Sequence, residues 1–233
     1  MSAIFKREFR AYFTSPIAYV VMALVTFFSA YMFSYYYQSG YADIGGSFYM
    51  IFFILLIAAP LLTMRLFSEE KRQKTDQLLL TSPVSLWGIV FGKFFAAYAV
   101  FGISLIITVV YEVMFAAKAA PDLLNYFGNL LGVLLVAAAL IAIGLFVSSV
   151  MESQVVAAIV SIAISIALLF LDGIVGLFKA DWLSEAAELF AFQTRYTTFT
   201  QGQFSYADFL FFVGIASIFL FLTSRVLEKK RWA

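Results

Sequence analysis

Long runs of apolar residues alternate with short polar stretches along the whole chain. A helix needs about 20 predominantly apolar residues to cross a bilayer. By that rule the sequence predicts six spanning helices, at about residues 17–37, 48–67, 86–115, 124–148, 155–175 and 206–226. We therefore expect an all-α membrane protein in which residues 1–233 form a single transmembrane domain.

The first fifteen residues have a different pattern, with aromatic and basic side chains on opposite sides of a helix. Phe5 and Phe9 recur at helical spacing, whereas Arg7 and Arg10 fall on the other side. Helices of this kind lie in the headgroup plane, with their basic face toward anionic lipid. We expect residues 1–15 to form such an interfacial helix before the first span.

The segment from Arg65 to Ser85 is the only long, strongly charged stretch in the interior of the sequence. Six of the eight residues from Glu69 to Asp76 are ionisable. Thr75 can cap a helix that Asp76 opens with a favourable charge, and Leu78 to Leu80 give that helix an apolar side. A loop between spans can be charged simply because it is wet. The alternative, which we favour, is a membrane-surface helix that a soluble partner grips.

Composition agrees with the apolar pattern and excludes several classes of function. Hydrophobic residues make up 64% of the chain and charged residues 12%, against about 45–50% and about 25% in soluble domains. The mean hydropathy is +0.96. Without cysteine or histidine there is no thiolate metal site, and the commonest general base is missing. A net charge of +1 gives no reason to expect nucleic acid as a partner.

The positions of lysine and arginine predict the orientation of the spans. With the N-terminus inside, twelve of the fifteen basic residues are cytoplasmic: Lys6, Arg7, Arg10, Arg65, Lys71, Arg72, Lys74, Lys93, Arg225, Lys229, Lys230 and Arg231. Six spans then leave both termini in the cytoplasm. The one substantial outer segment is 176–205, where residues 181–192 are patterned as a short helix that lies on the outer leaflet or dips into it.

Two pairs of glycines are spaced for close packing of helices in lipid. Gly88 with Gly92, and Gly128 with Gly132, form small-xxx-small pairs. These pairs serve packing within one subunit or an interface between subunits. The first pair, followed by Lys93, is not a phosphate-binding loop, because its spacing is one residue short and no Ser or Thr follows the lysine.

Ionisable residues inside spans are costly and are therefore candidates for function. Four qualify: Lys93, Glu112, Asp172 and Asp208. For Lys93 the alternative is that its side chain snorkels to the inner interface. The three carboxylates lie near outer span ends, where the same alternative applies. An enzyme activity would have to rest on these few carboxylates.

Several segments resemble the ABC-2 type transporter permeases, and most closely the gliding-motility-associated subfamily. The shared motif runs through Arg65, Ser68-Glu69-Glu70-Lys71, Thr75, Leu78 to Ser85, and Gly92-Lys93. The N-terminal KREFRAYFTSPIAYV and the C-terminal FLFLTSRVLEKKRW are also similar.

This resemblance implies a permease of a bacterial cytoplasmic membrane that moves an exported substrate without itself being an enzyme. Two permease subunits, identical or different, would pair with two separate ATPase subunits that bind ATP and magnesium. A cytoplasmic coupling helix between spans two and three would dock on the ATPase, and outer re-entrant helices would occupy residues 177–204. The residues implied in the docking contact are Glu69, Glu70, Arg72, Thr75, Asp76, Leu78 and Leu79. The alternative is a membrane anchor of an ABC ATPase complex with a mechanical or signalling role.

Overall fold

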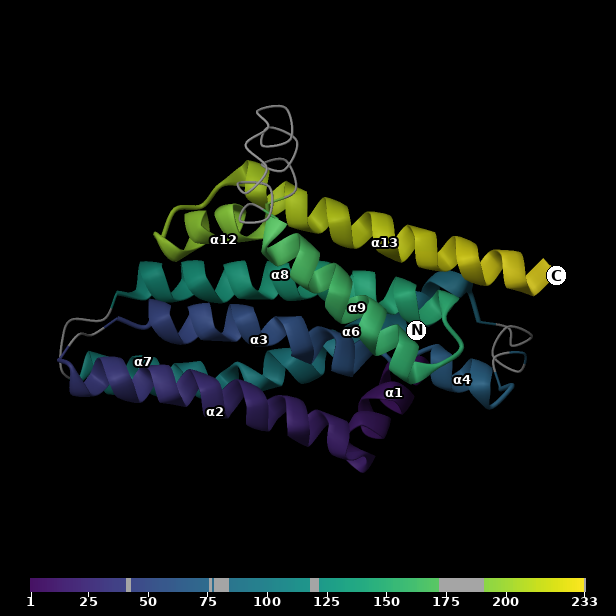
Figure 1. The fold of residues 1–233 in the computed structure, drawn as a ribbon, viewed down its shortest axis with the longest axis horizontal. Coiled ribbons are helices and arrows are strands. Elements are labelled where there is room, and N and C mark those ends of the chain that lie inside the picture. Colours follow the sequence, from purple (N-terminus) through teal and green to yellow (C-terminus); the bar gives the residue numbers. More distant parts are fainter. Residues whose placement is uncertain (41–42, 76, 78–83, 118–121, 172–190, 233) are drawn as a thin grey trace.

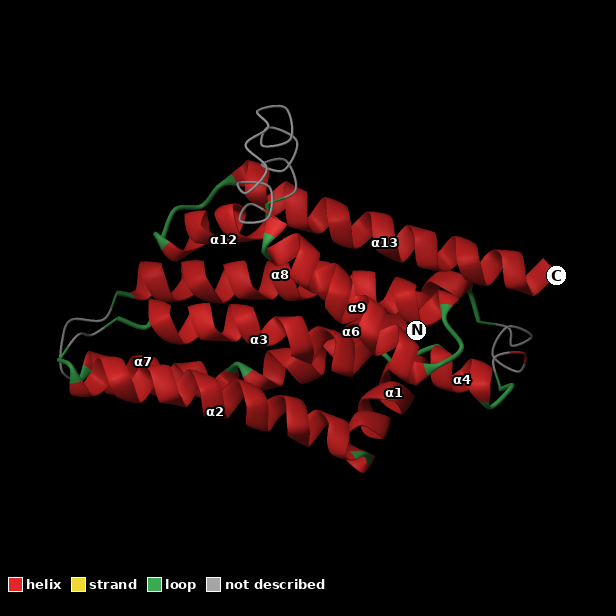
Figure 2. Ribbon diagram, in the orientation of Figure 1, coloured by secondary structure: helices red, strands yellow, loops and turns green. Residues whose placement is uncertain are grey.

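The structure, a computed structural model, describes residues 1–40, 43–75, 77, 84–117, 122–171 and 191–232. Within this part of the chain the regular elements are all helices (Figure 2). In chain order they are α1 (Ser2–Thr14), α2 (Pro16–Gln38), α3 (Gly45–Thr63), α4 (Ser68–Arg72), α6 (Leu86–Ser104), α7 (Ile106–Ala116), α8 (Leu123–Val150), α9 (Gln154–Leu169), α12 (Phe192–Thr200) and α13 (Tyr206–Trp232).

Five helical stretches of the described chain are long and apolar enough to cross a membrane: Pro16–Gln38, Gly45–Arg72, Leu86–Ala116, Leu123–Val150 and Tyr206–Arg231. They match the first four predicted spans and the last. The predicted span 155–175 begins as α9, a shorter apolar helix, and its last residues fall outside the described part of the chain. For the described residues, an all-helical architecture with five candidate membrane-spanning helices is therefore confirmed.

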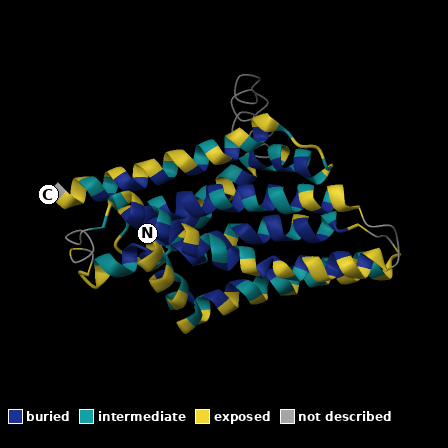
Figure 3. Cartoon of the chain, turned by 180° about the vertical axis from the view of Figure 1, so that it is seen from behind, coloured by how far each residue is buried: buried dark blue, intermediate teal, exposed yellow. Residues whose placement is uncertain are grey.

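Helix α8 lies at the centre of the bundle and packs against α3, α6, α9, α12 and α13. In its most apolar stretch 72% of the residues are buried, compared with 28% in α2 and 33% in α13. Figure 3 shows the same division, with buried positions concentrated on α8 and α3 and exposed ones along α2 and α13. The exposed residues of the outer helices include large apolar side chains such as Phe27, Tyr31, Leu210 and Ile218, as expected for helices that face lipid.

Small residues on α8 allow its neighbours to approach closely. A Cβ atom at Gly144 would lie 2.1 Å from Thr63 Oγ1 on α3. At Gly128 it would lie 2.6 Å from the carbonyl oxygen of Phe199 on α12, and at Gly132 it would lie 2.9 Å from Phe199 Cβ. The second predicted glycine pair thus packs α8 against α12 within the chain.

The third predicted span is interrupted once, between α6 and α7. Leu105 N donates to Gly102 O, and the hydroxyls of Ser104 and Thr108 donate to Phe101 O and Leu105 O. Side-chain hydroxyls that bond to backbone carbonyls in this way often bend a helix. The two helices still form one continuous candidate span, Leu86–Ala116.

The two ends of the bundle differ in what they carry (Figure 1). At one end lie α1, α4 and the end of α13; we call this the basal end. The end of α2, the start of α3 and helix α7 lie toward the opposite end, which we call the distal end. Helix α1 meets α2 in a corner at Ser15, whose extended backbone (φ −110°, ψ 159°) precedes a proline at the first position of α2.

Candidate functional site: a buried charge cluster at the basal end

The charged segment that follows the second span begins with a short helix at the basal end. After α3 the chain turns through Met64 to Phe67 and forms α4. Glu69 and Glu70 lie in the first turn of α4, and Lys71 and Arg72 lie in the last, an order that suits the helix dipole. The helix ends where Lys74 adopts a left-handed backbone with φ 55°.

Lys93, on α6, points into the protein rather than out of it. Its side chain is 1% exposed, and its Nζ lies 3.1 Å from Glu8 Oε1 on α1 and 2.9 Å from Glu70 Oε1 on α4. The same Nζ donates to Leu66 O at 2.5 Å. The ammonium group thus donates to Glu8 and Leu66 and forms a further ion pair with Glu70.

Arg7 of α1 closes the arrangement from the other side. Its Nη2 lies 2.5 Å from Glu8 Oε1 and 2.7 Å from Glu70 Oε1. Each of the two carboxylate oxygens therefore lies between a guanidinium and an ammonium group. We call Arg7, Glu8, Glu70 and Lys93 the basal charge cluster; its two positive and two negative charges balance.

The pKa values at α1 reflect this pairing. Burial acts to raise the pKa of Glu8, but the charge of Lys93 and the hydrogen bond and charge of Arg7 outweigh it, and the pKa of Glu8 is lowered. For Arg7, burial acts to lower the pKa, but Glu8 and Glu70 outweigh it and the pKa is raised. Both groups are therefore charged at neutral pH.

The cost of burying these charges explains why they must stay together. Removing one partner of a buried ion pair typically costs about 3–5 kcal/mol, because the other charge is left without compensation. Within the described residues Glu70 Oε2 is buried and has no hydrogen-bond partner, so Oε1 makes all the contacts of this carboxylate. Helices α1, α4 and α6 are thus held together through two shared oxygens.

Helix α4 is also joined to the end of α8. Lys71 Nζ donates to Ser149 O and to Met151 O. Ser148 Oγ accepts the backbone N–H groups of Phe67 and Ser68, at 3.1 and 3.2 Å. These contacts satisfy amides that the start of α4 would otherwise leave unpaired. Consecutive residues of α4, Glu70 and Lys71, thus bind to different helices.

A further contact fixes α1 against the end of α3. The hydroxyl of Tyr12, which is fully buried, donates to Leu62 O. The guanidinium of Arg65 lies over the same ring, 4.8 Å from its centroid. Burial raises the pKa of Tyr12, so the hydroxyl stays protonated and remains a donor.

Comparison with protein families identifies the family to which this helical membrane protein belongs. The model of the family described as "ABC-2 family transporter protein" matches residues 2–233. The chain belongs to the ABC-2 transporter family. Curated protein sequences gave no match. Membership makes this chain the membrane component of an ABC transporter, a part that is not itself catalytic.

In this ABC-2 protein one predicted docking residue is directed inward, three others are not members of the basal charge cluster, and the rest lie outside the described part of the chain. Glu70 lies in the basal charge cluster, whereas Arg72 is exposed. Glu69 accepts a bond from Gln73 Nε2 at 3.3 Å, and Thr75 Oγ1 donates to Glu70 O at 3.3 Å. The remaining predicted residues, Asp76, Leu78 and Leu79, lie outside the described part of the chain, as does most of the helix predicted from Thr75 onward.

The residues predicted for the interfacial helix are divided between two sides of α1. Phe5 and Phe9 stack at 5.6 Å, and Arg10 is exposed. Arg7, expected to face lipid headgroups, is half-exposed and directs its guanidinium to the basal charge cluster. Helix α1 also covers the first glycine pair: a Cβ at Gly92 would lie 3.0 Å from Ile4 Cγ2, and one at Gly88 would lie 3.6 Å from Met1 N.

The other predicted intramembrane polar residues do not join this cluster. Glu112 is buried on α7. Asp208, at the start of α13, pairs with Arg195 of α12 at 2.8 Å, and that guanidinium also lies 4.3 Å from the centre of the Phe211 ring. Asp172 lies outside the described residues. Among the described residues, no three acidic side chains are grouped to hold a metal ion.

Sequence reasoning did not identify Glu8 or the role of Ser148. The signal for Glu8 was present: Ile4, Glu8 and Tyr12 recur every four residues and form the buried face of α1. A lone acid on an otherwise basic segment, in register with buried neighbours, is a candidate partner for a buried cation. No comparable signal marks Ser148, whose partners are backbone amides brought to it by the fold.

Proposed function

We propose that this chain is the permease subunit of an ABC transporter and that ATP hydrolysis on a separate nucleotide-binding subunit drives it. The partner docks at the basal end, on the charged segment of residues 65–85. The observation that carries the proposal is that two consecutive residues of α4 are bound to different helices. Glu70 joins α4 to α1 and α6, while Lys71 joins it to the end of α8.

These contacts can convert a displacement of α4 into movement of the spans. A helix attached to only one neighbour could be displaced without moving the other spans. Helix α4 is instead bound to α1 and α6 through Glu70 and to the end of α8 through Lys71, by buried and partly buried polar contacts, and breaking such contacts is costly. A push on the basal end is therefore passed to α6 and α8, which together contact most of the bundle.

In this proposal most of the predicted docking residues contact the ATPase subunit, and one of them passes the displacement of α4 to the spans. Glu69, Arg72 and Thr75, with Asp76, Leu78 and Leu79, contact the ATPase subunit. Glu70 instead transmits the displacement, since its carboxylate is directed inward.

The arrangement in the membrane follows from the same proposal. The basal end faces the cytoplasm of a bacterial cell and contains both termini, with α1 in the headgroup plane. Residues 155–175 form the fifth of six spans, and the re-entrant helices of residues 177–204 lie on the outer side. Two such subunits, identical or different, form the complete permease. The segments shared with the gliding-motility-associated permeases support assigning the chain to that subfamily.

Charge reversal at the exposed face of α4 tests the docking. The chain is co-expressed with a candidate P-loop ATPase subunit from the same organism, and the complex is reconstituted into proteoliposomes. Arg72→Glu combined with Glu69→Lys should abolish co-purification and stimulated ATP hydrolysis, while the unfolding temperature of the chain alone stays unchanged. The matched control is Glu152→Lys, an exposed acid on the α8–α9 turn. A double variant that still binds the ATPase and supports normal hydrolysis would contradict the docking assignment.

A further inference from the structure

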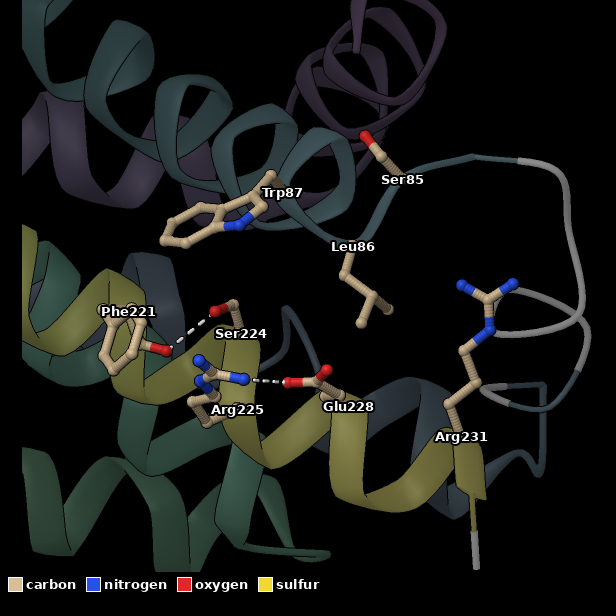
Figure 4. Close-up of a pocket in the computed structure, with 8 residues that line it drawn as sticks. All are labelled: Ser85, Leu86, Trp87, Phe221, Ser224, Arg225, Glu228 and Arg231. Atoms are coloured by element: carbon tan, nitrogen blue, oxygen red, sulfur yellow. Dashed lines mark hydrogen bonds and ion pairs between the residues drawn. The ribbon is translucent and has the colours of Figure 1, made fainter.

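A cavity of about 360 Å³ opens at the basal end, between the start of α6 and the end of α13 (Figure 4). It lies apart from the basal charge cluster and shares no residue with it. Its lining residues are Ser85, Leu86, Trp87, Phe221, Ser224, Arg225, Glu228 and Arg231. A volume in this range is typical of small-molecule sites.

The walls of the cavity are basic on one side and aromatic on the other. The side chains of Arg225 and Arg231 come from α13, and Leu86 and Trp87 face them from α6 (Figure 4). The Arg225 guanidinium lies 4.9 Å from the centre of the Phe221 ring. The rings of Trp87 and Phe221 lie 6.3 Å apart and bring the two helices together on the apolar side.

The charge of the lining is positive even after its internal ion pair is counted. Arg225 Nη1 lies 2.6 Å from Glu228 Oε2, and both side chains are largely exposed. Arg231 leaves the lining with one net positive charge, and Lys229 and Lys230 lie beside it on α13. A guanidinium offers five donors, so Arg225 can bind an anion while it remains paired with Glu228.

The apolar side of the cavity continues along both helices toward the middle of the membrane. On α6 the rings of Trp87, Phe91 and Phe95 stack in a row, with centroids 5.5 and 6.1 Å apart. On α13 the exposed residues Phe221 and Ile218 continue away from the basal end. A row of aromatic rings can pack against an acyl chain, whereas it offers no favourable contact to a small soluble anion.

We propose that this cavity binds an anionic phospholipid of the leaflet at the basal end. The lipid phosphate lies against Arg225 and Arg231, and one acyl chain follows the aromatic row of α6. Basic pockets between spanning helices are known to bind anionic headgroups in this way. The occupant is a lipid rather than free phosphate because the charged and the apolar walls are continuous.

The site would couple lipid binding to the segment that follows the charged loop. Ser85 caps α6, with its Oγ accepting a bond from Gly88 N at 3.1 Å, and the same helix carries Lys93. A lipid between α6 and α13 therefore fixes the start of the helix to which the basal charge cluster is attached. This inference requires only that the chain spans a membrane. Lipid binding can therefore fail while the docking of an ATPase holds, and the docking can fail while lipid binding holds.

Native mass spectrometry of the delipidated full chain tests the site. The protein is titrated with phosphatidylglycerol, and separately with phosphatidylcholine of the same acyl composition. Each basic residue near an anionic surface contributes roughly a fivefold change in affinity. Arg225→Gln with Arg231→Gln should therefore weaken phosphatidylglycerol binding by about tenfold or more and leave phosphatidylcholine unchanged. Glu228→Gln, which removes the competing carboxylate, should strengthen it.

Two controls distinguish this site from general attraction to lipid. Lys6→Gln with Arg10→Gln removes two exposed positive charges from α1, which lies in the same headgroup plane, and should weaken phosphatidylglycerol binding less than the α13 variant does. Inorganic phosphate at millimolar concentration should not displace the lipid. Equal affinity for the two lipids, an equal loss in the α1 variant, or displacement by inorganic phosphate would each overturn the proposal. Circular dichroism of every variant confirms that the chain has folded.

Discussion

Glu8 of α1 and Glu70 of α4 share the ammonium group of Lys93, at 3.1 and 2.9 Å. The two carboxylates would repel each other at this separation if no cation lay between them. Lys93 on α6 thus links α1 and α4, so that one side chain connects three helices that are distant in the sequence. Its removal should affect all three at once.

Replacing Lys93 with methionine should destabilise the chain by about 3–5 kcal/mol, because two buried carboxylates then share only Arg7. Thermal unfolding of the purified protein, followed by tryptophan fluorescence, measures this loss. Adding Glu8→Gln to Lys93→Met restores the balance of one positive and one negative charge. The double variant should therefore be more stable than Lys93→Met alone, a non-additivity expected of groups in direct contact. If the effects of Lys93→Met and Glu8→Gln on the free energy of unfolding were strictly additive, Lys93 and Glu8 would not interact.

Stability should also depend on pH through Glu8. Its pKa is lower in the folded protein than in the unfolded chain, where a glutamate has a pKa of about 4.3. The unfolded state therefore binds more protons near that pH, and the stabilisation, complete above about pH 4.3, is lost as the pH falls through the lower folded value. Unfolding temperatures between pH 3 and pH 6 should fall less steeply for Glu8→Gln than for the parent chain. Parallel curves for the two proteins would contradict the pairing.

The hydrogen bonds between α4 and the end of α8 should affect the transmission of movement to the spans more than they affect stability. Ser148→Ala leaves the amides of Phe67 and Ser68 without their acceptor, at a cost of about 1–3 kcal/mol. Lys71→Met removes the bonds to Ser149 and Met151. We expect the complex with Lys71→Met to hydrolyse ATP while moving less substrate, since α4 is then joined to the end of α8 mainly through Ser148. Tight coupling of hydrolysis to transport in this variant would argue against the role of Lys71.

Close packing of α8 against α12 predicts opposite effects of one substitution at two glycines. Gly128→Ala places a methyl group 2.6 Å from a backbone oxygen, so one helix must move, and the cost should be about 1–3 kcal/mol. Gly214→Ala is the matched control, because no atom lies within 4 Å of the added carbon. It should stabilise α13 by up to about 1 kcal/mol through helix propensity. The two unfolding temperatures should therefore move in opposite directions.

The sequence predicted the helices better than the contacts between them. Spans follow from the length of apolar runs, and the break before Leu86 follows from the charged segment, so both could be inferred locally. Lys93 was recognised as costly inside a span, but its partners could not be identified. They depend on the packing of α1 on α6, where Ile4 fits over Gly92, and no local pattern reports that contact. The Arg195–Asp208 pair joins α12 to α13 in the same long-range way.

The central claim is that α4 lies on the cytoplasmic side, where an ATPase subunit can reach it. Because the chain has no cysteine, a single Glu69→Cys substitution creates a unique target for a membrane-impermeant thiol reagent. Gln201→Cys, at an exposed residue between α12 and α13, is the matched control for the outer side. The account predicts labelling of Glu69→Cys in inverted membrane vesicles but not in intact cells, and the reverse for Gln201→Cys. Labelling of Glu69→Cys from outside intact cells would contradict it.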